Sequence, residues 1–244
     1  MGQMQFGIIG YPLGHSFSPG YFNRKFKEEK IDAIFDLFPI PQIGDIRELI
    51  SSHPALCGLS VTIPYKQQVI PYLDEIDAVA REVGAVNCIS VKNGFTKGYN
   101  TDIAGFRDSL IPLLKTGHKQ ALILGTGGAS HAVAYVLREL GINYQFVSRS
   151  KKESTLTYSE LTENIMAQYQ VVINTTPLGM YPNTDNFPPI PYQCLSAQHL
   201  LYDLVYNPGL TRFLSLGQEM GAVVKNGLEM LHLQAEKSWK IWTQ

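Results

Sequence analysis

Residues 120–149 constrain the fold more than any other part of the chain, because they follow the order strand, glycine-rich turn, helix, second strand. A short apolar run leads into a turn that contains Gly125, Gly127 and Gly128. Apolar residues then recur at helical spacing until Gly141. Such a turn lets backbone N–H groups approach a pyrophosphate at the positive end of a helix dipole. The pattern predicts a dinucleotide site, although the same turn also serves as a plain connection in parallel sheets.

The composition is that of an ordinary globular protein, with 244 residues, 45% hydrophobic and 17% charged. This length fits one large or two modest domains. A formal net charge of -1 gives no electrostatic reason to expect a nucleic-acid partner. No apolar run approaches the length of a membrane span, and the first residues lack the pattern of a signal peptide. We therefore expect a cytoplasmic protein that binds neither membranes nor nucleic acid.

The cysteines give no reason to expect a metal. Cys57, Cys88 and Cys194 are widely spaced among apolar residues, which is typical of reduced thiols in a core. His53 and Cys57 lie four residues apart, but Pro54 separates them and no second ligand pair follows. The sequence predicts no metal site.

A separate domain is predicted before the glycine turn. Buried strands are expected at 6–9, 33–38 and 57–62, with helical segments between them, in the order β-α-β-α-β. An Asn93-Gly94 turn between two short strands then predicts a hairpin. A second strand-helix series follows after residue 102, so we expect an α/β protein with two domains and a cleft where substrate meets cofactor.

Two serines follow the first predicted strand. Ser18 precedes Pro19, which predicts a helix with Ser18 as N-cap and proline at its first position. The hydroxyls of Ser16 and Ser18, in a loop beside a helix amino terminus, suit a small carboxylate equally well. The residues themselves leave both interpretations open.

Lys66 and Asp102 also have two interpretations each. Lys66 begins a helix after Pro64, where the helix dipole favours anions over cations. It is either an exposed, solvated lysine or an ammonium directed at an oxygen-rich substrate. Asp102 precedes a helical pattern, and either it or Thr101 is expected to cap that helix in the simpler interpretation.

Eight stretches extend these observations over nearly the whole chain. In order they are GYPLGHSFSP, GLSVTIPYK, GAVNCI, YNTDIAGF, GTGGAS, NTTPLGM, DLVYNP and GLEMLHLQA. Together they resemble the shikimate dehydrogenase family (the shikimate/quinate dehydrogenases), whose members reduce 3-dehydroshikimate in aromatic amino-acid and chorismate biosynthesis. The resemblance implies a substrate-binding α/β domain at 1–102, to which the helix 228–244 returns, and a Rossmann-type, doubly wound NADP-binding domain at 103–227.

The resemblance also implies a substrate site. Ser16 and Ser18 are expected to bind the substrate carboxylate, with Tyr206 from the second domain nearby. Lys66 is expected to stabilise the developing alkoxide and donate its proton, and Asp102 to hold Lys66 by a charge-assisted hydrogen bond. The residues implied to grip the ring hydroxyls and the carbonyl are Thr62, Lys66, Asn87, Asp102 and Gln234.

The cofactor is expected to be NADP. A Rossmann strand that selects NAD usually ends in an acidic residue, whereas Ser148-Arg149-Ser150 stands at that place here. Arg149 suits a 2′-phosphate and can stack on adenine, and the two serines add hydrogen bonds. The cofactor contacts that the resemblance implies are Gly125, Thr126, Gly127, Gly128, Ala129, Ser148, Arg149, Ser150, Thr175, Pro177, Leu178, Met180 and Gly227.

Three features depart from the family pattern. The family often has Asn where Ser60 stands, and Asn-Arg-Thr where Ser148-Arg149-Ser150 stands. The interval between Arg149 and Val171 is also too short for a full helix, strand and helix. We therefore expect a trimmed adenine side of the cofactor site.

Three alternatives remain beside this prediction. One is a quinate/shikimate dehydrogenase with relaxed substrate or NAD use, and another is a non-catalytic shikimate-binding relative. A third is a different two-domain Rossmann enzyme such as a methylene-tetrahydrofolate dehydrogenase. In each case the expected partner is a small-molecule substrate, and the expected assembly is a monomer or homodimer.

Overall fold

The computed structural model describes residues 3–14 and 16–244. The chain folds into two compact units, one running through Thr101 and joined by Ala235–Gln244, and the other comprising Asp102–Gln234. The division falls immediately before Asp102 and passes within the last helix, α9 (Leu228–Trp242). No helix of the described residues is long and apolar enough to cross a membrane.

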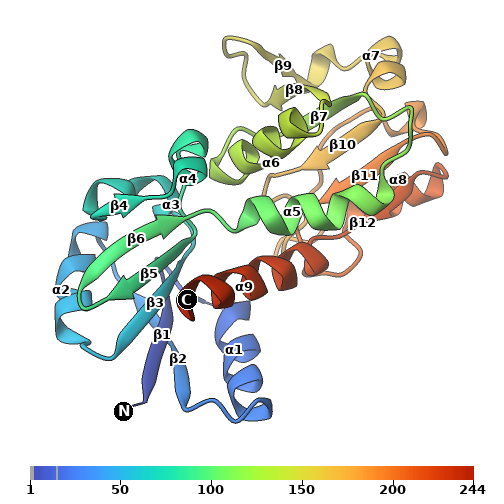
Figure 1. Cartoon of the computed structure of the whole chain (residues 1–244). Helices are drawn as coiled ribbons and strands as arrows, with labels where there is room; N and C mark the ends of the chain where they lie inside the picture. The colour runs from blue at the N-terminus through green and yellow to red at the C-terminus, as the bar shows by residue number, and fades with distance from the viewer. Residues whose placement is uncertain (1–2, 15) are drawn as a thin grey trace. The chain divides into compact units, whose positions relative to one another are not determined.

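A mixed six-stranded sheet forms the frame of the first unit, in the order β2-β1-β3-β5-β6-β4 (Figure 1). The pairs β1·β2, β1·β3 and β4·β6 are parallel, whereas β3·β5 and β5·β6 are antiparallel. The antiparallel pair β5·β6 is the hairpin predicted from Asn93-Gly94. The strands are β1 (Met4–Gly10), β2 (Ala33–Pro39), β3 (Leu56–Val61), β4 (Glu75–Ile76), β5 (Cys88–Lys92) and β6 (Phe95–Tyr99).

The end of α9 belongs to the core of the first unit. Trp242 stacks on Phe6 with ring centroids 5.2 Å apart, and its indole N–H donates to the Ile89 carbonyl at 3.0 Å. A Cβ at Gly58 would collide with the Trp242 ring, so glycine is needed there. The helices of this unit are α1 (Phe17–Glu28), α2 (Ile46–Ser52), α3 (Tyr65–Gln68) and α4 (Ala78–Val83), with 3₁₀ turns η1 (Ile43–Asp45) and η2 (Ile70–Tyr72).

The second unit is built on a six-stranded sheet in the order β12-β11-β10-β7-β8-β9, with every pairing parallel (Figure 1). The chain starts at the centre with β7, builds outward to β9 and then returns to the other side with β10. This reversal is that of a doubly wound Rossmann sheet, and it confirms the predicted fold class. The strands are β7 (Gln120–Leu124), β8 (Asn143–Ser148), β9 (Thr155–Thr157), β10 (Val171–Asn174), β11 (Leu200–Asp203) and β12 (Val223–Lys225).

Fully buried apolar runs explain why these strands pair in parallel. Ala121, Leu122, Ile123 and Leu124 of β7 are all 0% exposed, as expected for a strand covered on both faces. The helices of this unit, besides the start of α9, are α5 (Asp102–Leu110), α6 (Gly128–Glu139), α7 (Glu163–Gln168) and α8 (Arg212–Glu219), with 3₁₀ turns η3 (Ile111–Leu113), η4 (Tyr158–Glu160) and η5 (Tyr192–Cys194).

One helix start differs from the prediction. The N-cap of α1 is Ser16, with extended backbone angles, and Ser18 and Pro19 lie within the first turn. Proline is tolerated there because the first-turn N–H groups have no partner inside the helix. The Ser16 hydroxyl makes no capping hydrogen bond among the described residues.

Candidate active site

Three of the predicted substrate residues are linked by the backbone at one edge of the first sheet. The Thr62 amide donates to the Ile9 carbonyl, near the carboxyl end of β1, at 3.0 Å. The Val61 amide donates to the Asn87 carbonyl at 2.8 Å. The Val86 amide donates to the Lys66 carbonyl at 2.7 Å. These bonds place the segments that carry Thr62, Lys66 and Asn87 side by side.

The loop that carries the two serines leaves β1 at the same edge. A Cβ at Gly10 would lie 2.6 Å from the Thr62 side chain, so the loop begins in close contact with the end of β3. The Tyr11 amide donates to the Ile63 carbonyl at 3.3 Å. Ser16 is half-buried and Ser18 is buried.

The side chain of Asn87 is held in one orientation. Its Nδ2 donates to Thr101 Oγ1 at 3.0 Å, and its Oδ1 accepts from the Thr101 amide at 2.6 Å. Thr101 Oγ1 in turn lies 3.0 Å from Ser238 Oγ. Thr101 was predicted only as a helix cap and Ser238 was not singled out. Ser238 belongs to this hydrogen-bonded group because the end of α9 packs into the first unit.

A pocket of about 370 Å³ lies at the carboxyl ends of β7, β8 and β10 in the second unit. This is the switch point of the sheet, where doubly wound folds bind nucleotides. The predicted cofactor residues that line it are Gly125, Thr126, Gly127, Ser148, Arg149, Ser150, Thr175, Pro177 and Leu178. Val147, Lys152, Tyr158 and Thr176 also line it and were not predicted, whereas Gly128, Ala129, Met180 and Gly227 are not among its lining residues.

The glycine turn is shaped by its contact with the end of β10. Gly125 has a positive φ of 107°, and a Cβ there would lie 2.8 Å from Thr175 Oγ1. The Thr175 amide and hydroxyl both donate to the Leu124 carbonyl, at 2.9 and 2.7 Å. Gly127 caps α6, a twelve-residue helix whose amino terminus therefore faces the pocket. Glycine is required at 125, and the open turn leaves backbone N–H groups for an anion.

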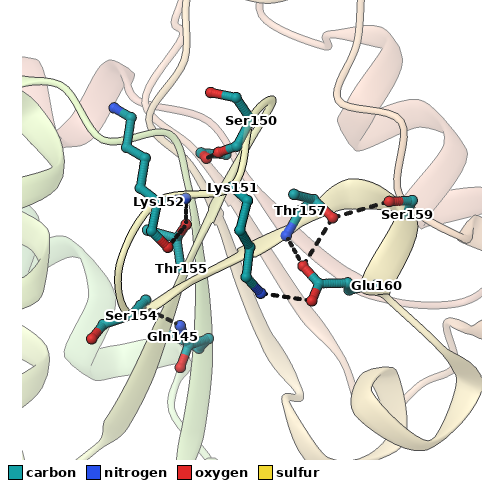
Figure 2. Close-up of polar contacts among 10 residues, drawn as sticks. Gln145, Ser150, Lys151, Lys152, Ser154, Thr155, Thr157, Ser159 and Glu160 are labelled. Carbon is teal, nitrogen blue, oxygen red and sulfur yellow. Dashed lines mark hydrogen bonds and ion pairs between the residues drawn. The ribbon is translucent and has the colours of Figure 1, made fainter.

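The segment after β8 is short, and one of its contacts is with the partly exposed carboxylate of Glu160 (Figure 2). None of residues 149–154, all of them described, is helical, and the chain passes directly into β9. Lys151 Nζ lies 2.6 Å from Glu160 Oε1, while Glu160 Oε2 accepts from the amide and hydroxyl of Thr157 at 2.7 and 2.9 Å. The hydrogen bond from Lys151, followed by those from Thr157, lowers the pKa of Glu160 to about 2.

The ion pair with Glu160 distinguishes the two adjacent lysines. Lys152 points away from the Glu160 cluster in Figure 2, and its Nζ donates to Thr126 Oγ1 of the glycine turn at 3.1 Å. The pocket is therefore lined by two cations, Arg149 and Lys152. Burial raises the pKa of Tyr158, and Arg149 opposes that rise. The strand-end pattern pointed to Arg149 and did not identify Lys152.

The remaining predicted residues lie elsewhere in the second unit. Asp102 is buried at the first position of α5, and Tyr206 is half-buried after β11, where burial raises its pKa. Gln234 lies on α9 and donates to the Leu231 carbonyl at 3.0 Å. Met180 is exposed, and the Gly227 amide donates to the Val205 carbonyl at 3.1 Å.

Known proteins resemble this chain in sequence and in fold. Residues 8–89 match the family model for the shikimate dehydrogenase substrate binding domain. The shikimate dehydrogenase (NADP(+)) of Methanosphaera stadtmanae is 37% identical over 97% of this chain and 90% of its own length. A crystal structure of a shikimate dehydrogenase in complex with NADP+ superposes with a TM-score of 0.87 at 32% identity, covering 99% of this chain and 90% of that one. Quinate dehydrogenase from Corynebacterium glutamicum in complex with NAD gives 0.87 at 26% identity, covering 100% and 94%. The chain belongs to the shikimate dehydrogenase family.

Proposed function

We propose that the protein is an NADP-dependent oxidoreductase that reversibly reduces 3-dehydroshikimate to shikimate in aromatic amino-acid biosynthesis. The observation that carries this assignment is the pocket of the second sheet, where a glycine turn, a helix amino terminus and two cations meet in a chain of this family. Support also comes from the first sheet, where the segments that carry Thr62, Lys66 and Asn87 are joined by backbone hydrogen bonds.

The pocket fits NADP better than NAD. When bound, NADPH supplies the hydride. The open turn at Gly127 and the dipole of α6 suit the pyrophosphate, while Arg149 suits the 2′-phosphate. The sequence Ser148-Arg149-Ser150 has no acidic side chain to accept from a ribose 2′-hydroxyl. Thr175, Pro177 and Leu178 are assigned to the nicotinamide side.

For the substrate, we assign Ser16, Ser18 and Tyr206 to the carboxylate, because each hydroxyl can donate a hydrogen bond. Lys66 acts as the general acid: its ammonium stabilises the oxygen on which charge develops and then donates a proton to it. Asp102 holds that ammonium by a charge-assisted hydrogen bond. In the reverse direction a neutral Lys66 accepts the proton. Thr62, Asn87 and Gln234 complete the contacts to the ring.

Lys66→Ala and Asp102→Asn should each lower kcat by about 10²–10⁴-fold, because each removes a group from the proton-transfer step. Steady-state NADPH oxidation with 3-dehydroshikimate measures this, and Lys27→Ala on the exposed face of α1 is the matched control. Near wild-type turnover in either site variant would remove the acid–base assignment.

The same assay tests the function as a whole. Shikimate and quinate are each supplied with NADP and with NAD, and the proposal expects the highest kcat/KM for shikimate with NADP. Quinate is the second candidate substrate, because a quinate dehydrogenase shares the fold at 26% identity. A preference for quinate with NAD would favour that candidate, and inactivity with all four pairs would favour a non-catalytic binding protein. The cytoplasmic location and the assembly as monomer or homodimer stay predictions.

A further inference from the structure

Asp203, the last residue of β11, is a fully buried carboxylate that the assigned function does not use. Its side chain is 0% exposed. Asp203 Oδ1 accepts from Asn174 Nδ2 at 2.9 Å and from the Val205 amide at 3.0 Å, and Oδ2 accepts from Thr211 Oγ1 at 2.6 Å. These three donors come from three different segments: the end of β10, the loop after β11 and the N-cap of α8.

Asn174 extends this network into the loop on the nicotinamide side. Asn174 Oδ1 accepts from the amide and hydroxyl of Thr176 at 3.0 and 2.6 Å, and its Nδ2 also lies 3.3 Å from the Leu178 carbonyl. A Cβ at Gly179 would lie 3.3 Å from Thr211 Cβ, so the loop also packs on Thr211, the residue that donates to Asp203 Oδ2. Thr176 and Leu178 both line the cofactor pocket.

On its other side the network reaches the loop that carries Tyr206. The Val205 amide donates to Asp203, and the Val205 carbonyl accepts from the Gly227 amide at 3.1 Å. The Tyr181 amide donates to the Asn207 carbonyl at 3.1 Å, which ties the two loops together directly. The loops after β10 and β11 are therefore both anchored on Asp203, in addition to their direct hydrogen bond.

Burial of a carboxylate at this point has an energetic disadvantage. Desolvation raises the pKa of Asp203 to about 6, although the hydrogen bonds from Thr211, Val205 and Asn174 oppose the rise. An apolar side chain would fill the space without that penalty but would leave three buried donors without an acceptor. The chain thus retains an unfavourable group whose contribution is to fix the geometry of two loops.

We infer that Asp203 is a positioning residue of the cofactor site, whose carboxylate keeps the nicotinamide-side loop after β10 and the Tyr206 loop after β11 in the arrangement that hydride transfer needs. The inference rests on the proposed function for the identity of the reaction. Misplacement of reacting groups by about 1 Å can slow a reaction about a hundredfold. A residue that acts only on stability would leave the turnover of folded molecules unchanged.

The test compares Asp203→Asn and Thr211→Val with two controls. Thr211→Ser keeps the hydroxyl that donates to Asp203, and it should retain wild-type behaviour. His199→Ala removes a buried side chain at the opposite end of β11, where His199 Nδ1 accepts from the Ser196 amide and Nε2 lies 3.0 Å from the Met166 carbonyl. That control should lower the thermal midpoint and leave kcat unchanged.

The measurements are kcat, the primary isotope effect with deuterated NADPH, and NADPH binding by fluorescence without substrate. Asp203→Asn and Thr211→Val should lower kcat by roughly ten- to a hundredfold, raise the isotope effect and weaken NADPH binding. If both variants fold and show wild-type kcat, isotope effect and binding, the inference is wrong. An inactive wild type would overturn the proposed function instead, and the binding measurement would still decide whether Asp203 shapes the pocket. If Asp203→Asn does not fold, the comparison of Thr211→Val with Thr211→Ser in the same three measurements decides the inference.

Discussion

Two carboxylates contact the connections at the carboxyl end of the second sheet, but in opposite surroundings. After β8, Glu160 pairs with Lys151 in a segment where both side chains are substantially exposed, at 40% and 60%. After β10 and β11, Asp203 is 0% exposed and accepts three hydrogen bonds. The exposed connection carries the cations that line the cofactor pocket, whereas the buried carboxylate accepts hydrogen bonds from the segments around two loops.

The pKa values of the two carboxyls move in opposite directions for this reason. Hydrogen bonds from Lys151 and Thr157 lower the pKa of Glu160 to about 2 because solvent still reaches the group. Desolvation raises the pKa of Asp203 to about 6 despite its three donors. The carboxylate of Glu160 thus favours folding at higher pH, whereas the carboxyl of Asp203 favours folding at lower pH.

The largest expected effect concerns Asp203 and pH. Its carboxyl binds a proton more tightly in the folded chain, so its contribution to the free energy of unfolding is fully present below pH 4 and is lost as pH rises through about 6. A shift of about two pKa units corresponds to roughly 3 kcal/mol. Urea unfolding of wild type and Asp203→Asn at several pH values isolates this contribution. Parallel pH curves for the two proteins would contradict it.

A smaller and different effect is expected at Arg149. Arg149→Ala should raise KM for NADPH about tenfold more than KM for NADH. Both cofactors lose the stacking on adenine, but only NADPH loses a charged partner of its 2′-phosphate. The thermal midpoint should stay unchanged. The variant Lys152→Ala, measured in the same assay, shows whether Lys152 contacts the 2′-phosphate or the pyrophosphate. A loss restricted to NADPH places Lys152 at the 2′-phosphate, and an equal loss with both cofactors places it at the pyrophosphate. An Arg149→Ala enzyme that loses affinity for NADPH and NADH equally would contradict the assignment of Arg149 to the 2′-phosphate.

The smallest effect is expected at Glu160. Glu160→Gln breaks an exposed ion pair and frees Lys151, so KM for NADPH should stay within about twofold of wild type. Added salt should reduce even that difference because it screens exposed charges. Lys151→Ala is the matched control. A large loss of stability or affinity in Glu160→Gln would remove the contrast with Asp203.

Much of the site could be predicted from the sequence, because its determinants are local. Gly125 marks a turn that needs positive φ, and the absence of an acid around Arg149 indicates NADP. The start of α1 was placed two residues late, because Pro19 is equally compatible with several positions in a first turn. The sequence likewise did not identify Lys152, because its place at the pocket differs from that of Lys151 only through Glu160, nine residues away from Lys151.

The sequence by itself determined a two-domain α/β fold of this family with a dinucleotide cradle, since glycine turns and buried apolar strands act over a few residues. Only the tertiary structure decided how the loops around the cradle are anchored. Asn174 and Asp203 are 29 residues apart and meet because β10 and β11 pair in parallel with Asn174 opposite Asp203. Once side by side and out of water, the carboxylate and its donors satisfy one another, since no solvent is there to replace them.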